Sequence, residues 1–331
     1  MSTILVTGGA GFIGSHVAEH LLGNGHTVVI VDDLSGGMRE NVPAQAHFVE
    51  GSILDAELIQ KLFAEHAFDY VFHLAAYAAE NLSHFVKRFN YQNNLIGSVN
   101  LINQSIIHKV KCFVFTSSIA VYGKGQNPLS ESMRPEPQDP YGIAKFAVEM
   151  ELAASHKMFG LPYIIFRPHN VYGERQNISD KYRNVIGIFM HQLLRGQEMT
   201  IFGDGNQQRA FTYIRDIAPT IASSIDTPQA YQQTFNIGAN EPHTINAVAE
   251  LVAQSLGKPA NVKYLEARQE VYEAYSDHSK ARRYFSLPAD TQLPEGLALM
   301  ARWAKSPSLN PQNNSPELEI IEKIPSYWAS K

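Results

Sequence analysis

The stretch Ile4-Leu5-Val6-Thr7-Gly8-Gly9-Ala10-Gly11-Phe12-Ile13-Gly14, near the start of this 331-residue chain, decides the fold. The apolar run Ile4–Thr7 is typical of a buried strand, and Gly14–Asn24 has the spacing of a helix. Glycines at 8, 11 and 14 allow a tight turn and bring backbone N–H groups close to a pyrophosphate. Glycine spacing of this kind also occurs in ordinary loops, but the flanking strand and helix favour a dinucleotide-binding turn.

Asp32 closes the second apolar run, Val28–Asp32. A carboxylate at this place accepts hydrogen bonds from the adenosine ribose and repels a 2′-phosphate. The nearest following arginine, Arg39, is not adjacent to it. The sequence therefore predicts NAD rather than NADP, the alternative being that Asp32 or Asp33 only begins a turn.

Strand and helix patterns alternate through the first half of the chain. Further buried strands are expected at Tyr70–Leu74, Cys112–Thr116 and Tyr163–Arg167, and helices at Ala56–His66, Phe89–His108 and Tyr141–Phe159. Short, nearly continuous apolar strands separated by helices predict an α/β fold, a Rossmann-like doubly wound parallel sheet.

The pattern loosens after Arg167, where Gly, Pro and Asn become frequent and helices are expected at Val185–Arg195 and Thr244–Leu256. We expect residues 1–167 to form the NAD-binding domain and residues 168–305 a smaller, interleaved C-terminal substrate-binding region. Residues 211–238, with a helix over Ile214–Ile225 and a strand over Thr234–Gly238, are expected to return to the main sheet. Residues 306–331 are predicted to be a linker and tail, since Ser306–Pro316 is rich in Ser, Pro and Asn.

Composition narrows the class of protein. The formal net charge of −5 argues against a dedicated nucleic-acid binder, which carries a basic face. The single cysteine, Cys112, excludes an intrachain disulfide and is interpreted as a core residue. No stretch approaches the ~20 apolar residues that a membrane span needs, and the N-terminus lacks a signal peptide's pattern. We therefore expect a cytoplasmic protein without nucleic-acid or membrane partners, and no metal site.

A reactive group is predicted from Ser118, Tyr141 and Lys145. Tyr141 and Lys145 stand four residues apart at the start of a helical stretch, so both side chains lie on one helix face. A nearby ammonium and a positively charged nicotinamide ring would both favour a tyrosine phenolate. Ser118 follows the strand Cys112–Thr116, at the edge of the sheet where ligands bind. Taken alone, Tyr-x-x-x-Lys usually marks a solvated helix face, and the serine could simply cap the next segment.

With these motifs in place, residues 3–305 resemble the extended short-chain dehydrogenase/reductase family of NAD-dependent epimerases and dehydratases, and especially its UDP-glucose 4-epimerases. The resemblance rests on ordered motifs across both predicted regions, namely Thr7–Gly14, His73–Ala76, Asn93–Gly97, Ser118–Gly123, Tyr141 with Lys145, Arg167–Gly173, Ile201–Gly205, Arg209–Ile214, and Arg268 with Tyr275–Asp277.

The resemblance implies a role for each matching position. Ser118 and Tyr141 would contact the sugar O4, Tyr141 as the base, while Lys145 binds the nicotinamide ribose. The cofactor would be bound by Gly8, Gly11, Phe12, Ile13, Gly14, Asp32, Asp33, Leu34, Ser35, Ser52, Ile53, Leu74, Ala75, Ala76, Asn93, Tyr141, Lys145 and His169. The nucleotide diphosphate would be held by Asn170, Asn184, Arg209 and Arg268, the base would lie beside Phe202, and Tyr275 would limit the sugar pocket.

The activity implied is C4 epimerisation of a nucleotide-sugar with NAD that stays bound, through a transient 4-keto intermediate. UDP-glucose and UDP-galactose are the expected substrates, with UDP-glucuronate or an N-acetylated sugar left open. Three positions depart from the family pattern: Ser52 stands where family members often have Asp, Ala78 replaces a Lys, and His169 replaces a Phe. These departures leave the exact sugar open.

Other activities remain as alternatives. Related dehydratases carry an acidic pair directly after the serine position, and related decarboxylases a Glu, whereas this chain has Ile119-Ala120. That difference favours epimerisation over dehydration or decarboxylation. A simple ketone reductase and a catalytically silent NAD-binding regulator are the remaining readings. The family also suggests a homodimer that pairs Phe89–His108 with Tyr141–Phe159.

Overall fold

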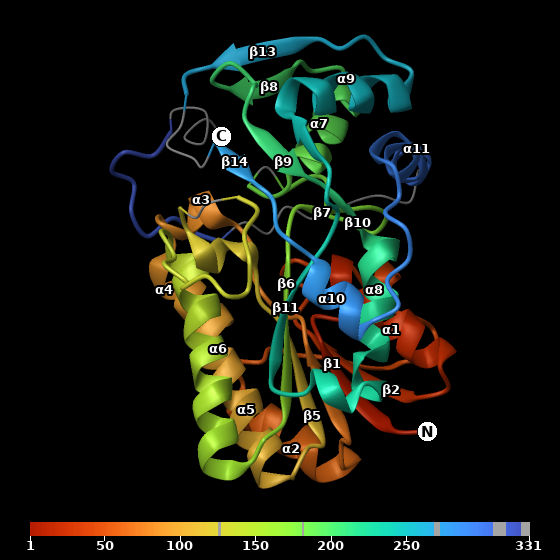
Figure 1. Cartoon of the computed structure of the whole chain (residues 1–331), viewed down its shortest axis with the longest axis vertical. Helices are drawn as coiled ribbons and strands as arrows, with labels where there is room; N and C mark the ends of the chain where they lie inside the picture. Colours follow the sequence, from red (N-terminus) through yellow and green to blue (C-terminus); the bar gives the residue numbers. More distant parts are fainter. Residues whose placement is uncertain (125–126, 181, 268–271, 307–315, 326–331) are drawn as a thin grey trace.

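A seven-stranded sheet lies at the centre of the computed structural model, which describes residues 1–124, 127–180, 182–267, 272–306 and 316–325 (Figure 1). The strand order is β11-β6-β5-β4-β1-β2-β3, and every neighbouring pair is parallel. The strands are β1 (Thr3–Thr7), β2 (Thr27–Asp32), β3 (His47–Glu50), β4 (Tyr70–His73), β5 (Cys112–Thr116), β6 (Tyr163–Pro168) and β11 (Gln233–Ile237). The predicted fold class is thereby confirmed.

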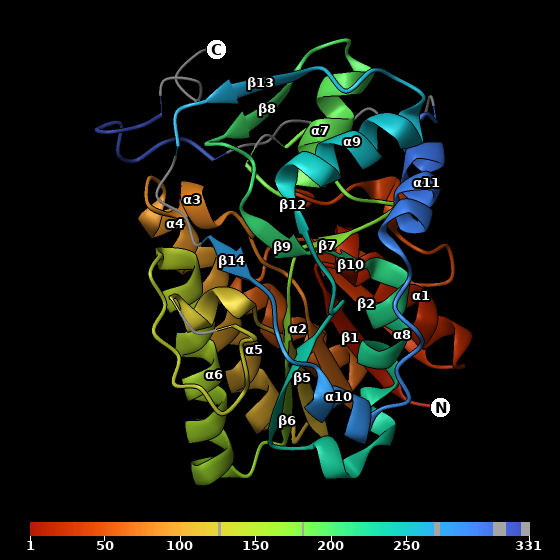
Figure 2. The ribbon, with the colours of Figure 1, turned by 45° about the horizontal axis from the view of Figure 1, so that its top comes forward.

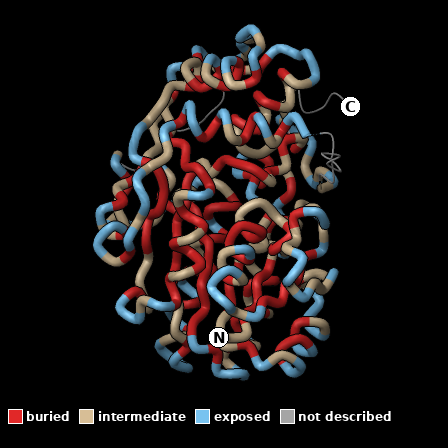
Figure 3. The backbone as a smooth tube through the Cα atoms, turned by 90° about the vertical axis from the view of Figure 1, so that its right-hand side faces the viewer, coloured by how far each residue is buried: buried red, intermediate tan, exposed pale blue. Residues whose placement is uncertain are grey.

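Helices cover both faces of the sheet. Figure 1 shows α1 (Phe12–Gly23) and α8 (Ile214–Ser223) on one side, and α2 (Ala56–His66), α5 (Gly97–Ile107) and α6 (Pro140–Phe159) on the other. Side chains alternate along β1, so Ile4 and Val6 join the core beneath α1 and α8, while Leu5 joins the core beneath α2, α5 and α6. The strands form the buried centre of the molecule (Figure 3).

The ends of α6 are fixed by local chemistry. The Asp139 carboxylate accepts a hydrogen bond from Gly142 N at 2.9 Å, and Pro140 occupies the first turn, where its missing N–H has no consequence. Gly160 ends the helix at φ +77°. This N-terminus places Tyr141 and Lys145 in the first two turns, at the carboxyl edge of the sheet.

A second, smaller part of the chain lies above this edge (Figure 2). It holds helices α7 (Val185–Leu194), α9 (Ile245–Leu256) and α11 (Leu293–Ala304), while α10 (Ser279–Tyr284) packs beside β11. Its strands pair in small sheets: β7 (Val171–Tyr172) with β10 (Thr212–Tyr213), β8 (Met199–Phe202) with β13 (Val262–Leu265), and β9 (Gln208–Ala210) with both β12 (Pro242–Thr244) and β14 (Glu273–Ala274).

The chain passes between the two parts more than once. After β6 it builds α7 and β8, returns through α8, and enters the main sheet as β11, which pairs with β6 from Gln233↔Ile164 to Ile237↔Pro168. The strand expected over Thr234–Gly238 corresponds to β11, which lies at the edge of the main sheet.

The helix predicted over Phe89–His108 is not uniform. Instead α3 (Glu80–Ser83) and α4 (Lys87–Tyr91) lead into a π-helical turn, Gln92–Ile96, before α5 begins. The tail packs here: the Glu319 carboxylate accepts hydrogen bonds from the backbone N of Arg88 and of Phe89, both at 2.8 Å. Within the described part of the chain, no helix is long and apolar enough to cross a membrane.

Candidate active site

A cleft of about 1240 Å³ opens at the carboxyl ends of the parallel strands. It lies where the strand order reverses between β1 and β4, the place at which open α/β sheets bind ligands. Its volume exceeds the ~300–1,000 Å³ of a pocket for one drug-sized ligand. The cleft therefore has room for a dinucleotide and a second ligand.

The glycine turn after β1 leaves no room for side chains. Gly8 has φ +70°, and the Gly11 N–H donates to Gly8 O at 3.0 Å. A Cβ at Gly14 would lie 2.0 Å from Gly8 O. The backbone N–H groups at the start of α1 are thus open to an anionic group, as pyrophosphate binding requires.

Asp32 is buried at the end of β2, where its carboxylate can accept hydrogen bonds from a ribose. One carboxylate oxygen accepts from Ala10 N at 3.0 Å and the other from Leu34 N at 2.9 Å, and burial raises the pKa of the group. Each oxygen retains a further acceptor site for a hydroxyl. The turn and this carboxylate together fit the adenosine and pyrophosphate of NAD.

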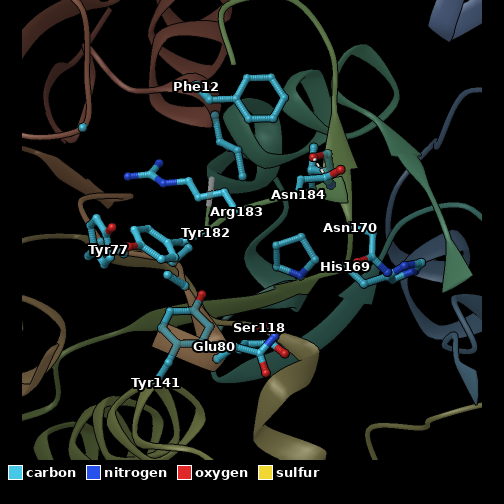
Figure 4. Close-up of a pocket in the computed structure, with 18 of the residues that line it drawn as sticks. Phe12, Tyr77, Glu80, Ser118, Tyr141, His169, Asn170, Tyr182, Arg183 and Asn184 are labelled. Atoms are coloured by element: carbon cyan, nitrogen blue, oxygen red, sulfur yellow. Dashed lines mark hydrogen bonds between the residues drawn. The ribbon is translucent and has the colours of Figure 1, made fainter. Parts of the chain in front are cut away.

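Ser118 and Tyr141 lie close together at the inner end of the cleft (Figure 4), and Lys145 lines the cleft with them. Lys145 is buried, its Nζ donates to Thr116 O at 2.9 Å, and burial lowers its pKa to about 7. Its Nζ lies 5.9 Å from the centroid of the Tyr141 ring. Burial raises the pKa of Tyr141, while a hydrogen bond with Ser118 lowers it. A phenol so placed needs a further positive charge nearby to act as a base at neutral pH.

A buried ion pair supports this group from beneath. The Arg167 guanidinium on β6 binds the Glu149 carboxylate of α6, one turn after Lys145, with 5% and 6% of the two side chains exposed. The Ser117 hydroxyl donates to the same carboxylate at 2.5 Å. The pair thus joins β5, β6 and α6 directly behind Ser118.

The upper wall of the cleft presents groups suited to a second, anionic ligand. Asn184 caps α7, accepting from Ile186 N at 2.9 Å and donating to Val171 O at 3.0 Å, so the N-terminus of this helix faces the cleft. Arg209 Nη1 donates to Gln208 O at 2.7 Å and to Tyr272 O at 2.9 Å. Phe202 lines the same wall.

His169 belongs to a buried pair. Its Nε2 lies 3.0 Å from His278 Nε2, and its Nδ1 lies 3.1 Å from Ala210 O, which also accepts from Asn170 Nδ2 at 3.1 Å. Burial lowers the pKa of His169 to about 4. The imidazole that stands in place of the family's Phe therefore packs beside the cleft as a neutral ring.

Most of the predicted site residues line this cleft. They are Gly8, Gly11, Phe12, Ile13, Gly14, Asp32, Asp33, Ser35, Ile53, Leu74, Ala75, Ala76, Asn93, Ser118, Tyr141, Lys145, His169, Asn170, Asn184, Phe202 and Arg209.

Three predicted residues do not line the cleft, and one cannot be placed. Ser52 Oγ accepts from Leu54 N at 3.3 Å and stabilises its own turn, while Leu34 at φ +59° turns the chain after Asp32. The backbone of Tyr275 pairs with Leu129, which leaves Ala274 rather than Tyr275 at the cleft. Arg268 lies outside the described residues.

Tyr77, Glu80 and Arg183 are among the lining residues that were not predicted. They come from the loop after β4, from α3 and from the residue before Asn184, and no short motif marks them. Glu80 lies close enough to Tyr141 to raise its pKa, and Arg183 lies close enough to lower it. Among the described residues, no group of three or more His, Cys, Asp or Glu side chains is placed to hold a metal ion.

Comparison with known proteins finds a matching family and several similar proteins. The family model described as NAD dependent epimerase/dehydratase family matches residues 4–238. A Thermotoga maritima UDP-glucose 4-epimerase, solved with UDP-glucose, is 37% identical with a TM-score of 0.87, covering 91% of this chain and 98% of that one. A Bacillus cereus UDP-glucuronic acid 4-epimerase, solved with UDP-glucuronic acid and NAD, is 30% identical with a TM-score of 0.84, covering 92% and 99%. A UDP-N-acetyl-alpha-D-glucosaminuronate decarboxylase from Bacillus cytotoxicus is 31% identical, covering 90% of this chain and 96% of its own.

Proposed function

This chain belongs to the NAD-dependent epimerase/dehydratase family, and from that premise we propose that it is a nucleotide-sugar 4-epimerase acting on UDP-glucose and UDP-galactose. The observation that carries the proposal is the group Ser118, Tyr141 and Lys145 beside the cofactor turn, followed by Ile119-Ala120 without an acidic side chain. An oxidation that is reversed on the same ligand needs this group and no further acid.

Each residue of the group has a task in that reaction. Ser118 orients the sugar O4, and Tyr141 removes its proton as the C4 hydrogen departs. NAD, which the Gly8–Gly14 turn and Asp32 would hold, would supply hydride transfer at C4, and the keto sugar would turn over in the cleft between removal and return of the hydride. Tyr141 then gives the proton back to O4. Lys145, held by Thr116 O, favours the Tyr141 phenolate once a positive nicotinamide ring lies nearby.

The second ligand would bind through its diphosphate. The N-terminus of α7 and the Arg209 guanidinium both face the upper part of the cleft, and both suit a dianion. Phe202 offers a face against which a uracil can pack. These features support a UDP-sugar, and they contact the part of the substrate that all UDP-sugars share, which leaves the sugar to be decided by experiment.

We also propose a homodimer through α5 and α6. Large apolar side chains on these helices are exposed, among them Ile107 at 64%, Met150 at 59%, Met158 at 75% and Phe159 at 62%. Several such side chains on neighbouring helices are typical of a surface that another protein covers.

The test is to incubate the purified protein, without added cofactor, with UDP-glucose, UDP-galactose, UDP-glucuronate and N-acetylated UDP-sugars. Products are examined by NMR and by mass. A C4 epimer of unchanged mass supports the proposal and identifies the sugar.

A second candidate reaction rests on Glu80, whose carboxylate lies within electrostatic range of Tyr141. A base at this position can remove a proton next to a 4-keto group and so promote loss of water. Loss of water in the same experiment would establish dehydration, and loss of carbon dioxide from UDP-glucuronate would establish decarboxylation. Either result would contradict the epimerase.

A further inference from the structure

Arg183 reaches across the mouth of the cofactor half of the cleft. It belongs to the segment that precedes α7 on the substrate side, yet a Cβ at Gly36 would lie 2.6 Å from its Nη2. Gly36 belongs to the loop after β2, on the opposite wall. Both residues line the cleft, so the guanidinium joins two walls that the chain builds from distant segments.

The side chain is held in this position from several directions. Its Nε lies 2.8 Å from Asp180 Oδ2, and its Cζ lies 5.1 Å from the centroid of the Tyr77 ring. Figure 4 shows Arg183 extended between Phe12 of the phosphate turn and Tyr77. Only 20% of the Arg183 side chain is exposed.

The loop that Arg183 touches is tied to the phosphate turn. Met38 N donates to Ala10 O at 2.9 Å, and Asn41 Nδ2 donates to the same oxygen at 3.2 Å. A Cβ at Gly37 would lie 2.7 Å from the carbonyl carbon of Ala10, so this loop packs directly on the turn. A guanidinium placed against Gly36 therefore lies near the place where the turn would hold a pyrophosphate.

Two other cations of the cleft are directed elsewhere. Lys145 donates to Thr116 O at the inner end, and Arg209 donates to backbone carbonyls on and beside β9. Asp32 and Asp33 add negative charge to the cofactor wall. Of these three cations, Arg183 is the one set against the loop that borders the phosphate turn.

We propose that Arg183 is a latch that retains NAD, by covering the pyrophosphate and closing the cleft against the Gly36 loop. A reversed oxidation requires the reduced cofactor to remain in place until the hydride is returned, and such a latch slows its escape. The inference rests on the family's cofactor and not on the identity of the sugar. It can therefore fail while the proposed function stands.

The test measures cofactor release directly. Full-length protein is loaded with NADH, mixed with excess NAD⁺, and followed by the loss of bound NADH fluorescence. Loss of one charge-assisted hydrogen-bonding group corresponds to about a 10- to 100-fold change in an equilibrium or rate. We expect R183A to release NADH faster by about that factor.

Two variants separate the latch from a general effect of charge. G36A keeps the arginine but displaces its guanidinium. The backbone of Gly36 is not in the left-handed region, so alanine adds no backbone strain there. Release should accelerate in G36A, and R183A/G36A should be no faster than R183A, because both changes remove one contact. The matched control is R39A, which removes an exposed cation that stacks on Phe48 outside the cleft.

The latch is established if R183A and G36A release NADH fast while R39A releases it at the wild-type rate. Release by R183A at the wild-type rate overturns it, as does equal acceleration in R39A. A rise in the KM for the UDP-sugar with unchanged NADH release would assign Arg183 to the substrate instead. Matching circular dichroism spectra for all variants exclude misfolding as the cause.

Discussion

Replacing Glu149 with Gln should destabilise the protein far more than the loss of one hydrogen bond. The carboxylate is the counter-charge of Arg167 in a site where 5% and 6% of the two side chains are exposed, and it also accepts from Ser117. Gln has nearly the same shape and no charge, so the guanidinium stays buried without a counter-ion. Removing one partner of a buried pair costs about 3–5 kcal/mol.

Urea denaturation of cofactor-free protein, followed by tryptophan fluorescence, measures this loss. With an m-value of about 3 kcal/mol per M, a change of about 3–5 kcal/mol lowers the unfolding midpoint by about 1–1.7 M. The matched control is E149Q/R167M, which removes the unpaired charge as well and should recover a large part of the loss.

Two results would refute the reasoning. The first is an E149Q midpoint within about 0.3 M of the wild type, which would mean that Arg167 finds another partner or reaches water. The second is a double variant less stable than the two single losses combined, which would mean that the side chains stabilise the fold by packing and not by charge.

Four further outcomes are expected. Y141F should lose about 10²–10⁴-fold in kcat, as expected for removal of an acid–base group, with unchanged cofactor content by absorbance; a smaller loss would mean that another base acts. Because burial lowers the pKa of Lys145 to about 7 from 10.5, the unfolded chain binds more protons between these pH values, so the free energy of unfolding of cofactor-free protein should rise from pH 7 toward pH 10.5. K145M should flatten this rise in urea titrations, and an unchanged slope would contradict the assignment. G14A should abolish NAD copurification, since its Cβ would lie 2.0 Å from Gly8 O. M150E should shift the protein to a monomer in sedimentation, while the control Y264E, at an exposed side chain outside α5 and α6, should leave the mass unchanged.

Local signals explain what could be predicted from the sequence. The strand at Ile4–Thr7 and the glycine turn after it are contiguous in the chain, and their chemistry is readable there. By contrast, β3 (His47–Glu50) has half-exposed or exposed residues throughout and carries no continuous apolar run, so it was not predicted. The π-helical turn at Gln92–Ile96 has an ordinary helical sequence, and only its packing reveals it.

The candidate site also contains some residues that the sequence could predict and others that only the fold brings together. Tyr141 and Lys145 share one helix, and a four-residue spacing is sufficient to bring them together. Glu80 and Arg183 approach Tyr141 from separate segments, and their proximity depends on how the upper part of the chain sits over the sheet. Tyr275 was placed at the cleft by motif alone, and its pairing with Leu129 moved the contact one residue earlier, to Ala274.

The repeated passage of the chain between the sheet and the upper part limits how such an enzyme can change. β11 returns to lie beside β6, and the chain then leaves the sheet again into β12 and α9. The upper part is therefore not built from one continuous segment of the chain. A recombination that exchanged it whole would have to rejoin several breaks at once. New sugar specificities are therefore more accessible through single side chains on the upper wall than through exchange of domains, and directed evolution of this scaffold should favour point substitutions over chimaeras.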